Sequence, residues 1–254
     1  MQTKRIAILF SGNGSNLEAL IRALHQKCFI SKKLERDSQS NMKNEGFLIG
    51  GIAHSFTLLE PNALTDSKYT KLESKNLKSA QSRDSTMQEN APFKVEVVLA
   101  LSNKANAYGL KRAESLGVAT KVIESAGKAR EDFDKEVVAT LQALQLDLCV
   151  LAGFMRILTP LFTQNIHAIN IHPSLLPLFK GAHGIAESYA SPMRLGGVSV
   201  HYVSEELDSG EIIAQGVLAK NANESLESYE SRIHQLEHQL YPLAVLEALN
   251  QGIK

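Results

Sequence analysis

The chain has 254 residues, enough for one large α/β domain with a substantial core or for two small domains, and one domain is the simpler expectation. Its 27 basic residues equal its 27 acidic residues, so no surplus of charge favours a nucleic-acid backbone or an anionic membrane as partner. The two cysteines, Cys28 and Cys149, form neither a disulfide framework nor a metal-type pair, which fits a reducing compartment.

The amino-terminal residues MQTKRIAILF lead into a predicted strand and not into the run of about 18 apolar residues that a membrane span needs. No signal peptide is expected either. Together with the reduced cysteines, this start predicts a cytoplasmic protein.

Strands and helices alternate along most of the chain. The predicted elements are, in order, a strand at 6–10, a helix from Ser15, a strand at 94–101, a helix at 105–116 stopped by Gly117, a strand at 118–123, a helix at 131–144 and a strand at 147–153. Nearly continuous apolar strands separated by helices are typical of a parallel sheet that is covered on both faces. We therefore predict an α/β fold with a mostly parallel twisted sheet, whose ligands lie at the carboxyl ends of the strands.

Residues from about 31 to 92 interrupt this alternation. They are rich in Lys, Ser, Asn, Gln and Asp, and they contain one apolar island at 46–59. Polar stretches of this length rarely bury enough surface to become ordered, so we expect an insertion that forms a solvated or partly disordered loop. We assign it no function.

The pattern changes again after Gly196. Two β-rich runs at 196–203 and 211–219 predict an antiparallel addition to the sheet near the carboxyl terminus. The closing helix, within 224–252, is expected to be kinked or divided at Pro242.

The stretch SGNGSNLEAL at 11–20 marks the turn between the first strand and the first helix. Ser15 and Glu18 form a capping-box pattern that predicts the helix start at Ser15 and leaves unpaired N–H groups at the turn. Gly12 and Gly14 permit positive φ and allow a phosphate to approach the backbone. Because Leu17 occupies the place of a third glycine, the dinucleotide fingerprint is incomplete. A phosphate site and an ordinary tight turn both fit these residues.

Asn170 and His172 lie two apart at the end of a predicted strand, so their side chains project from the same face. An amide donor beside an imidazole suits the stabilisation of an oxyanion together with proton transfer, as acyl transfer requires. The alternative is an asparagine that satisfies backbone groups and a histidine that packs in the core.

A carboxylate partner for this histidine is expected in the turn EELDSG. Asp208 is the candidate, and Glu205 and Glu206 compete for the same role. The sequence contains no nucleophile elbow and no His/Cys cluster with metal spacing. Direct transfer between two bound substrates, without a metal, is therefore the predicted chemistry.

Six segments occur in a specific order. They are SGNGSNLEAL (11–20), SNKANAYGL (102–110), LAGFMRIL (151–158), INIHPSLLP (169–177), SVHYVSEELDSGEIIAQ (199–215) and LEHQLYPL (236–243). In these segments the chain resembles the phosphoribosylglycinamide formyltransferases, within the wider folate-dependent formyltransferase family. The resemblance covers nearly the whole chain except the insertion, and it implies a single formyltransferase domain over residues 1–254.

The resemblance implies transfer of a formyl group from 10-formyltetrahydrofolate, a co-substrate, to the amino group of glycinamide ribonucleotide in purine synthesis. It implies a metal-free monomer or homodimer in which Asn170, His172 and Asp208 are catalytic. The implied ribonucleotide contacts are Gly14, Ser15, Asn16, Leu17 and Glu18 at the phosphate, with His234 and Glu237 from the last helix. The implied folate-site residues are Arg130, Met155, Arg156, Ile157, Leu158, Asn170, Ser204, Glu205, Glu206, Leu207 and Asp208.

The chain departs from the family pattern in its insertion and at Lys180, where the family more often has a proline before the glycine. Three other functions predict different sequence features. A methionyl-tRNA formyltransferase would add a basic carboxyl-terminal domain, and a formyltetrahydrofolate hydrolase would add an amino-terminal regulatory domain, and we expect neither here. A non-catalytic phospho-ligand-binding protein would have no need for Asn170, His172 and Asp208 together.

Overall fold

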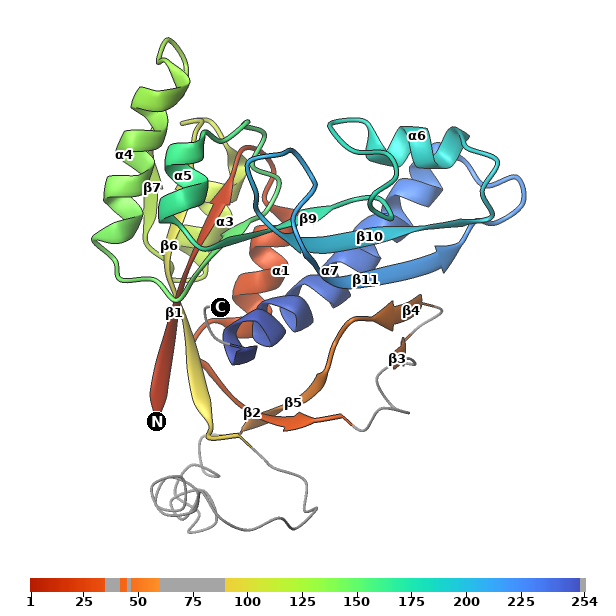
Figure 1. Cartoon of the computed structure of the whole chain (residues 1–254), viewed down its shortest axis with the longest axis horizontal. Helices are drawn as coiled ribbons and strands as arrows, with labels where there is room; N and C mark the ends of the chain where they lie inside the picture. The colour runs from red at the N-terminus through yellow and green to blue at the C-terminus, as the bar shows by residue number, and fades with distance from the viewer. Residues whose placement is uncertain (35–41, 45–46, 60–89, 252–254) are drawn as a thin grey trace.

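The computed structural model describes residues 1–34, 42–44, 47–59 and 90–251. In chain order the elements are β1 (Gln2–Phe10), α1 (Ser15–Leu24), β2 (Lys27–Lys33), β3 (Met42–Asn44), β4 (Phe47–Gly50), β5 (His54–Leu59), β6 (Phe93–Ser102), α3 (Tyr108–Ser115), β7 (Thr120–Val122), α4 (Arg130–Gln142), β8 (Leu148–Leu151), α5 (Pro160–Asn165), β9 (Ala168–His172), α6 (Gly184–Ala190), β10 (Leu195–Tyr202), β11 (Ile212–Ala219) and α7 (Leu226–Gln251). These strands form a single sheet (Figure 1).

The centre of the sheet is parallel. Strands β7, β6, β1, β8 and β9 are neighbours in that order, and each runs parallel to the next. β10 then pairs antiparallel with β9 and with β11, which confirms the predicted antiparallel addition. The predicted α/β class is also confirmed, although antiparallel strands flank the parallel centre on both sides.

Alternate residues of β1 enter two different cores. Ile6, Ile8 and Phe10 pack with buried residues of α1, α3 and α7, whereas Ala7 and Leu9 pack with α4 and α5. Because the side chains of a strand alternate between faces, this division places helices on both sides of the sheet. Figure 1 shows α4 and α5 together on one side and α1 beside α7 on the other.

The expectation of a solvated loop at about 31–92 is wrong for the described part of that segment. β4 pairs antiparallel with β11, and β5 pairs antiparallel with β2, so this segment adds strands at both ends of the sheet. The physical reason is the apolar island, in which Phe47, Ile49, Ile52 and Leu59 are buried. Residues 35–41, 45–46 and 60–89 lie outside the described part, and so does any expectation about them.

The expectation that Pro242 divides the last helix is also wrong. α7 runs without interruption from Leu226 to Gln251 with Pro242 buried inside it. A proline in a helix interior costs about 3 kcal/mol, because it removes one backbone hydrogen bond. Tertiary packing on both sides of Pro242 offsets this cost, since the Tyr241 hydroxyl donates to the carbonyl oxygens of Leu151 and Ile169 over 2.8 and 3.3 Å.

Two glycines allow α3 to touch the turn after β1. A Cβ atom on Gly14 would lie 2.7 Å from the Cα atom of Gly109, and a Cβ atom on Gly109 would lie 2.4 Å from the ring of Phe10. The Gly109 N–H donates to the carbonyl oxygen of Gly12 over 3.2 Å. The turn at 11–16 therefore packs against α3, and Gly109 of α3 packs in turn against Phe10.

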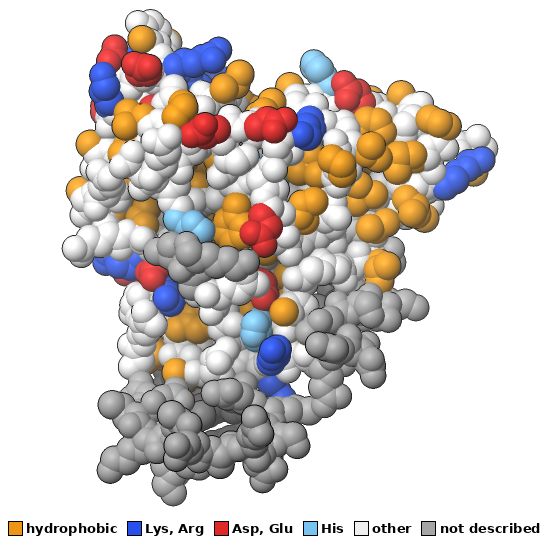
Figure 2. Space-filling model, viewed as in Figure 1, with side chains coloured by type: hydrophobic (Ala, Val, Ile, Leu, Met, Phe, Trp, Pro, Cys, Tyr) orange, Lys and Arg blue, Asp and Glu red, His pale blue; other side chains and the backbone are white. Residues whose placement is uncertain are grey.

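On the face shown in Figure 2, acidic and basic side chains are interspersed, and apolar side chains gather over β10 and β11. Leu195 and Ile212 at the ends of these strands are exposed. Within the described residues, no helix is both long enough and apolar enough to cross a membrane.

The contact between Gly14 and Gly109 predicts a specific destabilisation. Gly109→Ala should lower the free energy of unfolding by about 1–3 kcal/mol, because the added methyl group overlaps the Phe10 ring. Gly50→Ala is the matched control, since a Cβ atom there meets nothing within 4 Å. Urea denaturation of both variants measures the difference, and equal stabilities would contradict the close approach.

Candidate active site

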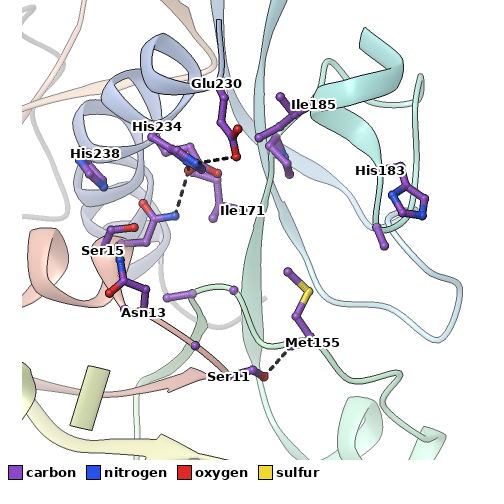
Figure 3. A pocket seen from close by; sticks show the side chains of 18 of the residues that line it. Ser11, Asn13, Ser15, Met155, Ile171, His183, Ile185, Glu230, His234 and His238 are labelled. Atoms are coloured by element: carbon purple, nitrogen blue, oxygen red, sulfur yellow. Dashed lines mark hydrogen bonds and ion pairs between the residues drawn. The ribbon is translucent and has the colours of Figure 1, made fainter. Parts of the chain in front are cut away.

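A cavity of about 770 Å³ opens at the carboxyl ends of β1, β8 and β9. Its walls are the turn at 11–16, the residues that follow β8, the end of β9 and one face of α7. Figure 3 shows His234 and His238 on α7 next to the turn that carries Asn13 and Ser15, with Met155 and His183 across the cavity. The cavity lies where ligands of parallel α/β sheets bind.

The turn at 11–16 presents the amino terminus of α1 to this cavity. Gly14 is the N-cap residue with φ 76°, and α1 begins at Ser15 as predicted. The predicted capping box is wrong, because no side chain caps this helix and the left-handed Gly14 makes the turn alone. The first N–H groups of α1 have no intrahelical partners and are free to bind an anion.

Leu17 and Glu18 are directed away from the cavity. The side chain of Leu17 is fully buried in the core, and the Glu18 carboxylate pairs with Arg22 over 2.7 Å and with Arg112. Neither residue lines the cavity. Their side chains therefore do not face a phosphate in this cavity, and the implied place of Leu17 and Glu18 at the phosphate stays a prediction about their backbone. Gly14, Ser15 and Asn16 line the cavity directly.

A chain of hydrogen bonds connects the turn to α7. The Asn16 amide nitrogen donates to Oε2 of Glu237 over 3.1 Å, and Nδ1 of His234 lies 2.8 Å from the same oxygen. Glu237 is 3% exposed. Its hydrogen bond raises the pKa of His234 and outweighs burial, which lowers that pKa. The structure thus brings three of the implied ribonucleotide residues together.

Two further residues of this cavity were missed in the sequence. Lys104 follows the carboxyl end of β6 and lines the cavity together with the turn. His238 follows Glu237, and its Nε2 atom is buried without a hydrogen-bond partner among the described residues. Burial lowers the pKa of His238, which favours the neutral form of its ring. Lys104 lies within the segment SNKANAYGL at 102–110, and the resemblance of that segment to the family is the signal that could have identified this lysine.

A second, smaller cavity of about 90 Å³ adjoins the first. Its lining contains most of the implied folate-site residues, namely Arg156, Ile157, Leu158, Asn170, Ser204, Glu205, Glu206, Leu207 and Asp208. Met155 lines the larger cavity instead. Asn170 and Ile171 are consecutive in β9 and line different cavities, so the two cavities meet across the end of this strand.

Asp208 lies between two histidines. Its Oδ2 atom is 3.4 Å from Nδ1 of His172, and its Oδ1 atom is 3.6 Å from Nε2 of His201. The Gly181 N–H donates to Oδ2 over 2.9 Å. Burial raises the pKa of Asp208, but the hydrogen bonds from His201 and Gly181 and the charges of both histidines outweigh burial and lower it. Asp208, and neither of the exposed glutamates before it, is the carboxylate partner of His172.

The prediction that the side chains of Asn170 and His172 project from the same face of β9 is correct. The structure also shows which atoms lie next to them. His172 is 4% exposed, and its Nε2 atom lies 2.7 Å from the carbonyl oxygen of Phe179. Both ring nitrogens of His172 therefore face acceptor oxygens. Gly184 packs against this ring, because a Cβ atom there would lie 3.0 Å from Nε2.

His201 is a site residue that the sequence analysis did not assign. It is opposite Asn170 in the β9–β10 pair, and its Nε2 atom lies 3.4 Å from the Asn170 amide nitrogen. Its Nδ1 atom faces the carbonyl oxygen of Tyr202 at 2.9 Å, which fixes a proton on Nδ1. Only the register of two strands that are distant in sequence could have revealed this contact.

Arg130 lies apart from the residues described so far. It is the exposed first residue of α4 and lines neither cavity, and its implied place in the folate site stays a prediction. Across the part of the chain that the structure describes, no group of three or more His, Cys, Asp or Glu side chains could hold a metal ion.

Comparison with known proteins agrees with this geometry. A sequence model described as formyl transferase matches residues 70–245. The chain is 41% identical to the phosphoribosylglycinamide formyltransferase of Escherichia coli (strain K12) over 147 residues, which are 57% of this chain and 69% of that protein. It is 36% identical to the trifunctional purine biosynthetic protein adenosine-3 of Homo sapiens over 165 residues, which are 64% of this chain and 16% of that protein.

Similar folds are also known. The crystal structure of phosphoribosylglycinamide formyltransferase from Campylobacter jejuni matches with a TM-score of 0.69 at 40% sequence identity, and the match covers 97% of both chains. A second structure, from Anaplasma phagocytophilum, matches with a TM-score of 0.66 at 30% identity and covers 99% of this chain and 89% of that one. The family match spans more than half of the sequence, and the chain belongs to the formyl transferase family.

Proposed function

We propose that this protein transfers the formyl group of 10-formyltetrahydrofolate to the amino group of glycinamide ribonucleotide, as the names of its relatives indicate. The observation that carries the proposal is the convergence of Asn170, His172 and Asp208 at the end of β9, where the two cavities meet. An amide, an imidazole and a carboxylate at one point are the groups that acyl transfer between two bound substrates requires.

The larger cavity suits the ribonucleotide. Its phosphate is assigned to the backbone N–H groups at Gly14, Ser15 and Asn16, where the positive end of α1 favours an anion. Lys104 supplies the balancing cation in the same wall. Glu237 is held by Asn16 and His234 with its carboxylate toward the cavity, so it can accept a hydrogen bond from a ribose hydroxyl or the glycinamide.

The smaller cavity suits the pterin end of the folate. Ile157 and Leu158 supply apolar surface, and the backbone of 204–208 supplies donors and acceptors for the edge of a heterocycle. The guanidinium carbon of Arg156 lies 4.9 Å above the ring of Phe133, which fixes this side chain on the wall of the cavity. The formyl group would then reach the end of β9 from the folate side.

In the proposed reaction the glycinamide amine attacks the formyl carbon, and a new C–N bond forms as the carbonyl oxygen becomes an oxyanion. The Asn170 amide and the protonated His172 donate hydrogen bonds to that oxyanion. When the carbonyl re-forms, the bond to the folate nitrogen breaks, and the proton lost by the amine passes to that nitrogen. Asp208 holds His172 in its charged form and positions the water that relays the proton.

The position of His172 adds one requirement to this reaction. Its Nε2–H is directed at the carbonyl oxygen of Phe179, so the ring must exchange that oxygen for the formyl oxygen. Both are oxygen acceptors, and the exchange therefore replaces one hydrogen bond with another. Asp208 keeps its hold on Nδ1 throughout.

The decisive experiment mixes the protein with 10-formyltetrahydrofolate and follows deformylation with and without glycinamide ribonucleotide. Formyl transfer that depends on the ribonucleotide is the expected result. Turnover that is the same without the ribonucleotide would instead indicate a hydrolase, and binding of the ribonucleotide without turnover would indicate a phospho-ligand-binding protein.

Asn170→Ala and His172→Ala should each lower kcat by about a hundredfold or more, because each removes a donor to the oxyanion. Ribonucleotide affinity, measured by calorimetry, should change little, since neither residue lines the larger cavity. His167→Ala is the matched control on the other end of β9 and should keep kcat within about twofold. Loss of folding in His172→Ala would support a purely structural histidine.

The pair of His234 and Glu237 predicts a pH dependence of stability. The pKa of His234 is raised above 6.5, so its contribution is fully present below about pH 6.5 and is lost as the pH rises through the folded value. Glu237→Gln should lower the pKa of His234 in an NMR titration. It should also destabilise the protein more at about pH 6 than at about pH 9. An unchanged His234 titration would contradict the assigned partner.

A further inference from the structure

Two loops meet above the catalytic groups. The 178–183 loop follows β9 and precedes α6, and the 204–209 loop connects β10 to β11. Figure 1 shows both loops on the same side of the molecule, near β9 and β10. The first provides the Phe179 carbonyl oxygen for His172 and the Gly181 N–H for Asp208, and the second contains Asp208 itself. The relative position of the two loops therefore sets the geometry of the catalytic pair.

Neither loop has a relaxed backbone at these contacts. Phe179 has φ 54° and Asp208 has φ 51°, and both are residues with a side chain in the left-handed region. Gly181 has φ 88°. Residues with a Cβ atom remain in this region only when surrounding contacts hold them there. The 178–183 loop thus needs a restraint that is outside its own backbone.

Lys180 lies between the two left-handed residues of its loop and extends to the other loop. Its ammonium group donates to the hydroxyl oxygen of Ser209 and lies 3.6 Å from Oε1 of Glu206. Both partners belong to the 204–209 loop and flank Asp208 in the sequence, so the side chain of Lys180 joins the two loops next to Asp208.

We propose that Lys180 is a positioning residue whose ammonium group latches the 178–183 loop to the 204–209 loop and so holds Phe179 and Gly181 against His172 and Asp208. The restraint comes from a side chain that extends from one loop to the other. The kinetic test of this proposal rests on the proposed formyl transfer. A second test, by hydrogen exchange, is independent of that reaction.

The latch has two consequences that distinguish it from ordinary loop stabilisation. The contact of Lys180 with Glu206 is exposed, so high salt should weaken it. The 204–208 residues line the smaller cavity, so a released loop should affect the folate side of the reaction and leave the ribonucleotide side alone. Arginine preserves the charge and should preserve most of the effect.

The kinetic test compares Lys180→Met, Lys180→Arg, Ser209→Ala and the double variant Lys180→Met/Ser209→Ala, with Lys135→Met as control. Lys135 is an exposed lysine paired with Asp132 on α4, outside both cavities. In Lys180→Met, kcat/KM for 10-formyltetrahydrofolate should fall by about three- to fivefold, the range of an exposed ion pair, while KM for glycinamide ribonucleotide stays within about twofold. The double variant should have the same kcat/KM for 10-formyltetrahydrofolate as Lys180→Met. Lys180→Arg should have a kcat/KM close to that of the native protein.

High salt should lower kcat/KM of the native protein and leave Lys180→Met nearly unchanged. The proposal is overturned if kcat/KM of Lys180→Met equals that of the native protein, or if kcat/KM of Lys180→Arg falls as far as that of Lys180→Met. It is also overturned if the fold-losses of Lys180→Met and Ser209→Ala multiply in the double variant.

Hydrogen exchange of the Gly181 amide separates failure of the latch from failure of the proposed function. This amide is bonded to Asp208 and should exchange faster in Lys180→Met than in the native protein and in Lys135→Met. If the amide exchanges faster in Lys180→Met but the native protein shows no formyl transfer, the contact between the loops is supported and the proposed reaction is rejected. Unchanged exchange would reject the latch whatever the activity.

Discussion

The buried carboxylate of Asp208 is the constraint on which the rest of the site depends. It is 7% exposed, and an unpaired charge at that depth would cost several kcal/mol. Two histidines from adjacent strands and one backbone N–H compensate it. The antiparallel pairing of β10 with β9 brings His201 beside Asn170, and the left-handed backbone at Asp208 directs the carboxylate between the two rings.

The long helix α7 connects this site to the rest of the molecule. Glu237 faces the larger cavity, and one turn further on the Tyr241 hydroxyl donates to the carbonyl oxygens of Leu151, at the carboxyl end of β8, and of Ile169 in β9. Near its end, the fully buried Glu247 accepts hydrogen bonds from the N–H and the ring of His54. The helix therefore fixes both the strands that carry the site and the segment that adds strands at the two ends of the sheet.

The alternation of side chains along β9 explains why two substrates can meet there without sharing a pocket. Ile171 faces the larger cavity, and Asn170 faces the smaller one. Under the proposed function each substrate binds on its own side of the strand, and only the groups at the strand end are accessible to both. A formyl group that passes around this end meets Asn170 and the histidine–aspartate pair in the place where the two cavities adjoin.

The sequence alone determined the features that depend on local spacing. Apolar runs and helical periodicity gave the parallel centre of the sheet, and the β-rich runs after Gly196 gave the antiparallel addition. The two-residue spacing of Asn170 and His172 predicted a shared face, because side chains in a strand alternate. Motif order predicted the family, and the family match confirmed it.

Tertiary structure decided whatever depends on contacts between segments that are distant in sequence. The choice of Asp208 over Glu205 and Glu206, the role of His201 and the inward packing of Leu17 all follow from strand register and burial, which no local pattern encodes. The same holds for α7, where packing against the sheet overrides the break that Pro242 predicts, and for the described part of the apolar island, where β4 and β5 form because sheet edges are available to pair with them. Local propensity is worth about 1 kcal/mol per residue or less, apart from proline, and tertiary burial exceeds it wherever the two disagree.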